Sequence, residues 1–170
     1  MDRAYALPNK RLRIFECRSS SQRFAVMGGV SSTSGRFTYI SKPKFFDRFD
    51  TIKFLQQLRS ENPNHKIAVF WDNCSIHYTK EVKAELRRLK IPTIMNVPYS
   101  PWFNGIEHLW GRFKWLYRRY LLELKIKEKV VSLRSIVPMI LAQTTNEFNL
   151  RCALRGEQTL LNKWNEMKEH

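Results

Sequence analysis

Two carboxylates could carry metal-dependent chemistry in this chain: Asp72 and Glu107, which are separated by the 34 residues 73–106. Asp72 ends an apolar run over residues 67–71, and Glu107 comes near the start of a helical pattern that follows a proline-rich turn. Hard divalent cations such as Mg²⁺ prefer carboxylate oxygens as ligands. A strand-end Asp and a helix-start Glu can hold such ions for phosphoryl transfer. The pair therefore predicts a metal site.

Each carboxylate also has a purely structural interpretation. Asp72 and Asn73 suit an Asx-turn that caps the next helix. Glu107 stands three residues after Asn104, which is the arrangement of a capping box. Spacing alone leaves these interpretations open, and only metal ligation predicts a function.

An alternation of strands and helices must position the two carboxylates. Apolar, β-branched and aromatic runs predict strands at residues 12–17, 23–32, 36–40, 67–71 and 93–97. Helical spacing of apolar residues predicts helices at residues 47–60, 79–89, 104–122, 132–148 and 157–168. We expect the first three strands to form an antiparallel meander and residues 67–71 to be buried on both faces. The order indicates an α/β fold, in which ligands bind at the carboxyl ends of strands.

The composition is that of a globular protein with a large excess of positive charge. A hydrophobic share of 43% excludes a disordered chain, and 170 residues fit one domain. The 30 Lys and Arg against 15 Asp and Glu leave a net charge of +15. Such a charge indicates an anionic partner, above all nucleic acid, although a basic subunit of a larger assembly is an alternative.

Cysteine usage and hydropathy bear on the compartment. Cys17, Cys74 and Cys152 show neither paired zinc spacing nor a disulfide framework. We therefore expect a reducing, intracellular location in the nucleus or cytoplasm, with an organelle as the alternative. No apolar run approaches the roughly 18 residues of a membrane span.

The two motifs together resemble the catalytic core of mariner-like transposases and related bacterial insertion-sequence transposases, an Asp-Asp-Glu superfamily with a ribonuclease-H-like fold. That pattern reads strand, Asp-Asn-x-x-x-His, helix, strand, Pro-x-Tyr-Ser-Pro-x-x-Asn-Pro-Ile-Glu, and a helix with Trp and Lys. The matching residues are Asp72, Asn73, His77, Pro98, Tyr99, Ser100, Pro101, Asn104, Ile106, Glu107, Trp110 and Lys114. The resemblance implies an α/β mixed sheet flanked by helices, in one domain over residues 1–170 with extra C-terminal helices from about 131.

The resemblance also implies metal-dependent cleavage and transfer of DNA strands. Asp72 and Glu107 would be catalytic and would hold two Mg²⁺ or Mn²⁺ ions, which flank an in-line displacement. Asn73 and His77 would support this site. The residues implied to contact DNA come from the loop beside the site and from the helix after it: Tyr99, Asn104, Arg112, Lys114, Arg118 and Arg119.

The sequence departs from the family pattern in two places. Gly105 replaces a Pro at the first helical position, a change that we expect to be sterically mild. The family's first Asp lies upstream of the basic loop that residues 4–11 resemble, and this sequence begins at Met1. We therefore expect an N-terminally incomplete core without the usual first strand. Residues 12–17, another chain or an upstream part of a longer protein would fill the gap, and activity would be degenerate.

Three functions are compatible with these observations. A transposase core would cleave DNA with Mg²⁺ or Mn²⁺ and would lose that activity on Asp72→Ala. A domesticated, catalytically dead basic subunit would assemble as a homodimer or within a larger ribonucleoprotein or organellar complex. A plain nucleic-acid-binding module would show steep salt dependence and little effect of changes at Asp72 or Glu107.

Overall fold

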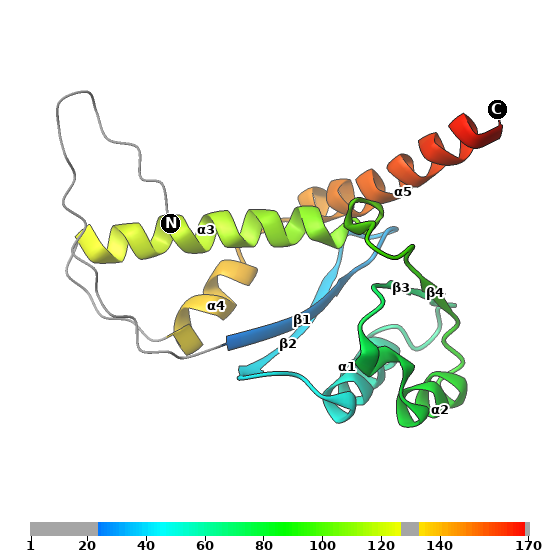
Figure 1. Cartoon of the computed structure of the whole chain (residues 1–170). Helices are drawn as coiled ribbons and strands as arrows, with labels where there is room; N and C mark the ends of the chain where they lie inside the picture. Colours follow the sequence, from blue (N-terminus) through cyan, green and yellow to red (C-terminus); the bar gives the residue numbers. More distant parts are fainter. Residues whose placement is uncertain (1–23, 127–132, 169–170) are drawn as a thin grey trace.

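The computed structural model describes residues 24–126 and 133–168, and its elements alternate between strands and helices (Figure 1). The predicted strand at residues 12–17 lies outside the described residues. The strands are β1 (Phe24–Val30), β2 (Phe37–Pro43), β3 (Val69–Trp71) and β4 (Thr93–Met95). The α-helices are α1 (Arg48–Glu61), α2 (Lys80–Arg88), α3 (Ile106–Ile126), α4 (Leu133–Leu141) and α5 (Asn146–Lys168). Two short 3₁₀ helices, η1 (Ser75–Tyr78) and η2 (Pro101–Phe103), complete this mixed α/β order.

β1 and β2 form an antiparallel hairpin, as predicted for the second and third strands. Their register runs from Phe24 opposite Pro43 to Val30 opposite Phe37. The turn needs Gly35, whose φ of 68° favours glycine. A Cβ at this position would also lie 1.8 Å from a backbone oxygen of α5. The turn is therefore fixed both by its own backbone and by the helix against it.

β3 and β4 form a short parallel pair, with Val69 opposite Thr93 and Trp71 opposite Met95. The prediction that residues 67–71 form a strand buried on both faces is wrong for β3, because Val69 and Phe70 are only half-buried. Val69 and Trp71 pack against α1 and α2, whereas Phe70 points to the opposite face. Within the described part of the chain, β4 is the one strand paired with β3.

Local caps explain why α1 and α2 begin where the sequence predicts. The Asp47 side chain accepts hydrogen bonds from the backbone N–H groups of Phe49 and Asp50, at 2.8 and 3.0 Å. The Asp50 carboxylate accepts in return from Asp47 N–H, which completes a capping box. Thr79 caps α2 by accepting from Val82 N–H.

The described residues bury two hydrophobic clusters. The α1–α2 cluster comprises Leu55, Trp71, Val82, Leu86 and Ile91. The α3–α5 cluster comprises Leu109, Phe113, Leu124, Ile136, Ile140, Leu141 and Cys152. The hairpin contacts both groups of helices, since β2 contacts α1 and β1 contacts α5 (Figure 1). None of the helices in residues 24–126 and 133–168 has the length and hydropathy needed to cross a membrane.

The predicted boundaries of the last two helices are wrong. The first helix ends at Leu141 instead of residue 148, and the second starts at Asn146 instead of residue 157. Thr145 sets the new start, because its side-chain oxygen accepts from Phe148 N–H at 3.2 Å. Residues 142–145 contain no Gly or Pro to mark a break, so helical spacing alone joined two elements that this cap separates.

The Glu85 carboxylate on α2 should make the stability of the fold sensitive to acid. Arg88 donates two hydrogen bonds to it, at 2.6 and 2.8 Å, and Gln56 donates a third. The Arg88 hydrogen bonds lower the pKa of Glu85 from 4.5 to about 2. Because the folded pKa is the lower one, this stabilisation is complete above pH 4.5 and is lost as the pH falls toward 2.

Glu85→Gln is therefore expected to flatten the acid limb of the stability curve. The difference between variant and wild type at neutral pH should be on the order of 1 kcal/mol, since Arg88 is largely exposed. Urea denaturation of both proteins at pH 7 and at pH 3 measures this difference in the free energy of unfolding. An acid limb that is as steep in Glu85→Gln as in the wild type would contradict the prediction.

Candidate active site

Asp72 follows the last residue of β3 and remains open to solvent, with 64% of its side chain exposed. Its Oδ1 accepts a hydrogen bond from Cys74 N–H at 3.0 Å and lies 3.2 Å from His77 Nε2. The Asx-turn interpretation is thus confirmed. Asp72 does not cap α2, however, because Thr79 does so.

His77 lies in η1 and is held beside Asp72 by an aromatic neighbour. Its imidazole stacks on the Trp71 ring, with centroids 4.1 Å apart and planes at 12°. Burial lowers the pKa of His77, and the charge of Asp72 opposes this shift. The ring is therefore fixed in orientation, and its neutral form is favoured.

Asn73 links the end of β3 to the segment after β4. Its Nδ2 donates to the carbonyl of Asn96 at 2.6 Å, and its Oδ1 accepts from Tyr78 OH. The buried Asn96 donates onward from Nδ2 to the carbonyl of Ser100 at 2.8 Å. These bonds attach the loop that leads to Glu107 to the strand end that carries Asp72.

Glu107 lies in the first turn of α3 with an exposed side chain. The capping-box interpretation is wrong, because the Asn104 N–H that the box requires donates to the Pro101 carbonyl at 2.9 Å. Asn104 instead caps α3 by accepting from Ile106 N–H at 3.4 Å. No other described side chain forms a hydrogen bond or ion pair with the Glu107 carboxylate. Tyr99, in the preceding turn, has a φ of 56° and is 97% exposed.

Two glycines fix the start of α3 against α5. A Cβ at Gly105 would lie 2.5 Å from the Cys152 carbonyl oxygen and 2.6 Å from that of Ala153. A Cβ at Gly156 would lie 2.5 Å from the backbone nitrogen of Gly105 and 2.6 Å from the Phe103 oxygen. A proline ring at position 105 would therefore overlap the α5 backbone, whereas glycine fits there. This contact between the helices places Glu107.

The structure gathers one group of potential ligands around Asp72, and it is not the predicted pair. The ligand atoms of Asp72, Cys74 and His77 all lie within 4.8 Å of one another, and Glu107 is outside this group. Sequence reasoning missed Cys74 because it searched for paired cysteines. The signal that could have found it is Asp-x-Cys-x-x-His, a mixed set of ligand types in one short turn.

The cations of α3 fall into two rows. Lys114 and Arg118 are exposed and follow Glu107 by seven and eleven residues, which puts all three on one face. Arg112 and Arg119 flank the half-exposed Trp115, with guanidinium carbons 4.5 and 5.6 Å from its ring centroid. We call Arg112, Lys114, Trp115, Arg118 and Arg119 the α3 basic face.

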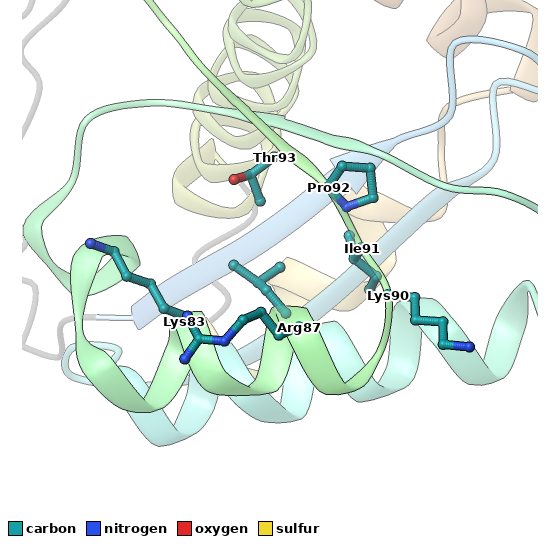
Figure 2. Close-up of a pocket in the computed structure, with 7 residues that line it drawn as sticks. Lys83, Arg87, Lys90, Ile91, Pro92 and Thr93 are labelled. Atoms are coloured by element: carbon teal, nitrogen blue, oxygen red, sulfur yellow. The ribbon is translucent and has the colours of Figure 1, made fainter.

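A shallow hollow beside α2 includes neither carboxylate among its lining residues (Figure 2). Its lining residues are Lys83, Leu86, Arg87, Lys90, Ile91, Pro92 and Thr93. Thr93 begins β4, so the hollow lies at the opposite end of the parallel β3–β4 pair from Asp72. It is lined by cations and apolar groups, with no carboxylate, thiol or imidazole to carry out chemistry.

A family model described as DDE superfamily endonuclease matches residues 1–125. The match includes Asp72, Glu107 and almost all of α3. The chain belongs to the DDE superfamily endonucleases. The transposase-type resemblance of the two motifs is thereby confirmed, and α4 and α5 lie beyond the matched residues of this DDE domain.

The DDE domain shares its fold with transposase and integrase structures. The catalytic domain of Mos1 mariner transposase is 15% identical, with a TM-score of 0.54 over 81% of this chain and 76% of that one. A chain of the Mos1 paired-end complex with left transposon end is 14% identical, with a TM-score of 0.61 over 92% of this chain and 47% of that one. A chain of the simian T-cell lymphotropic virus intasome is 18% identical, with a TM-score of 0.58 over 69% of this chain and 41% of that one.

These structural similarities establish the fold, which is the predicted ribonuclease-H-like α/β class. The chain spans less than half the length of the intasome and paired-end complex chains that it matches. A search of curated proteins found no match.

Proposed function

We propose that this DDE domain binds DNA along α3 and carries a degenerate strand-cleavage site. One observation carries the proposal: Glu107, the glutamate of the Asp-Asp-Glu pattern by resemblance, shares a helix face with Lys114 and Arg118. A DNA backbone that follows these cations would pass the carboxylate at the start of the same helix. Both predicted cleavage residues, Asp72 and Glu107, lie within the part of the chain that matches the family model.

The proposed cofactor, Mg²⁺ or Mn²⁺, fits the donor atoms of the site only in part. Structures of the Mos1 catalytic domain contain raltegravir with Mg and with Mn. Asp72 and Glu107 offer the oxygen ligands that these ions take. Among the described residues, however, the group around Asp72 contains a thiol and an imidazole and does not include Glu107. This set is a poor fit for two magnesium ions, so we expect little cleavage.

Charge and aromatic stacking support DNA binding. The net charge is +15, and the α3 basic face presents four cations along one helix. Trp115 and its flanking arginines offer a surface on which bases or sugars can stack. The Mos1 paired-end complex contains a transposon end, and that protein shares this fold. The exposed Tyr99 and the cap residue Asn104 would lie at the end of this DNA path.

Binding and cleavage assays on the full chain test the proposal. Affinity for a labelled duplex should fall steeply with salt, with a log–log slope of about −0.9 for each phosphate contact. Incubation of the duplex with Mg²⁺ or Mn²⁺ should yield few or no nicks. Failure to bind at low salt would exclude the DNA role. Robust metal-dependent nicking that disappears in Asp72→Asn would exclude degeneracy.

A second candidate function is a catalytically dead basic subunit of a larger ribonucleoprotein or organellar assembly. Exposed apolar side chains along the segment from β4 to η2 favour it, because exposed apolar surface is typical of interaction sites. They are Ile94, Val97, Tyr99 and Trp102, which are 53–97% exposed. Affinity purification from cells, followed by light scattering to measure the mass of the purified species, distinguishes this candidate from a free DNA-binding domain. A stable monomer that co-purifies with no partner would exclude both the assembly and a homodimer.

A further inference from the structure

The turn between β3 and α2 offers a ligand set that differs in chemistry from a magnesium site. We infer that Asp72, Cys74 and His77 bind one thiophilic divalent cation, with Zn²⁺ as the best-matched ion. Thiolate and imidazole are ligands that zinc accepts readily and that magnesium does not. The inference requires neither DNA binding nor strand cleavage by this domain.

The distances suit a tetrahedral ion. Asp72 Oδ1 and His77 Nε2 are 3.2 Å apart. Two such ligands on tetrahedral zinc, at about 2.1 Å from the metal, are roughly 3.4 Å apart. The three ligand atoms lie within 4.8 Å of one another. In such a site the thiol lies about 3.6 Å from the nitrogen. Cys74 is exposed, so its side chain can change rotamer to reach this distance.

Two of the ligands are already held in place. Stacking on Trp71 fixes the imidazole, and the Cys74 N–H holds the Asp72 carboxylate. Zinc would enter between Oδ1 and Nε2, the ring proton would reside on Nδ1, and the Cys74 thiol proton would leave to solvent. The exposure of Asp72 and Cys74 leaves a fourth position for water.

An ion bound here would engage Asp72 and thereby remove it from any magnesium site. Divalent zinc binds nitrogen, oxygen and sulfur sites more tightly than most other first-row metals. The degenerate cleavage site and the thiophilic site would thus compete for one carboxylate. The presence of Cys74 in the turn changes the preferred metal of this site from magnesium to zinc.

Cobalt spectroscopy on the full chain tests the site, because Co²⁺ reports thiolate ligation. Adding Co²⁺ to protein freed of metal should produce a thiolate-to-cobalt charge-transfer band at one equivalent, and Zn²⁺ should abolish it. Cys74→Ser retains Cys17 and Cys152 and should lose the band. Its zinc affinity, measured by competition with a chromogenic chelator, should fall by at least about 100-fold.

Alkylation provides a second measurement, on the wild-type chain. Zinc should slow the reaction of Cys74 with iodoacetamide, as read from the masses of its peptides, and should not protect Cys74 in Asp72→Asn. Circular dichroism establishes that both variants fold. A cobalt band of equal intensity in Cys74→Ser, or equal alkylation of Cys74 with and without zinc, would overturn the inference.

Discussion

Replacing Lys114 and Arg118 together by Glu is expected to weaken duplex DNA binding by about 100-fold at 0.1 M salt. Both side chains are exposed, and no described side chain pairs with either, so the change should leave packing intact. Each lost phosphate contact leaves one counterion bound to the DNA that would otherwise be released. Each new carboxylate also repels the DNA phosphates. Fluorescence anisotropy at several salt concentrations should show a log–log slope that is smaller by about 2.

The matched control changes the same charges on a different helix. Lys83→Glu with Arg87→Glu alters the hollow beside α2 and leaves the α3 basic face unchanged (Figure 2). It should weaken binding only slightly, through the long-range field of the protein. Equal losses in both double variants would show that binding follows net charge alone and would refute a specific path along α3.

Gly156→Ala is expected to destabilise the protein by about 2 to 3 kcal/mol, although alanine is the better helix former. The added Cβ would lie 2.5 Å from the backbone nitrogen of Gly105 and 2.6 Å from the Phe103 oxygen. Backbone atoms cannot rotate away as a side chain can, so α5 must move from the start of α3. A fall in the melting temperature of roughly 5 to 10 °C would accompany this loss.

Gly111→Ala is the control for helix propensity. Gly111 lies within α3, and a Cβ there would meet nothing within 4 Å. This substitution should stabilise the protein by about 0.5 to 1 kcal/mol. Urea denaturation of both variants measures the difference. Similar effects of the two substitutions would contradict the role assigned to the contact between Gly105 and Gly156.

Features that depend on neighbouring residues could be predicted from the sequence. Asp47 and Asp50 form a local capping box, and Thr79 caps α2, so α1 and α2 begin where their patterns indicate. The motif around Asp72 and the turn before Glu107 also lie in continuous segments. Their resemblance to transposase cores was therefore visible without a structure, and the family match confirms it.

Features that depend on distant residues could not be predicted. The need for Gly105 arises from α5, which lies almost fifty residues further along the chain. The half-buried state of Phe70 depends on which elements cover the second face of β3. In each case sequence pattern gave the residue type, and tertiary contacts decided its role.

The two hydrophobic clusters have a consequence for the carboxylates. Asp72 directly follows Trp71 of the α1–α2 cluster, whereas Glu107 is two residues before Leu109 of the α3–α5 cluster. The separation of the carboxylates therefore depends on how the two clusters are joined, through the hairpin and through the hydrogen bonds of Asn73 and Asn96. A ligand that contacts both carboxylates would bind only while both clusters are folded. It would therefore couple the unfolding of the α1–α2 cluster to that of the α3–α5 cluster.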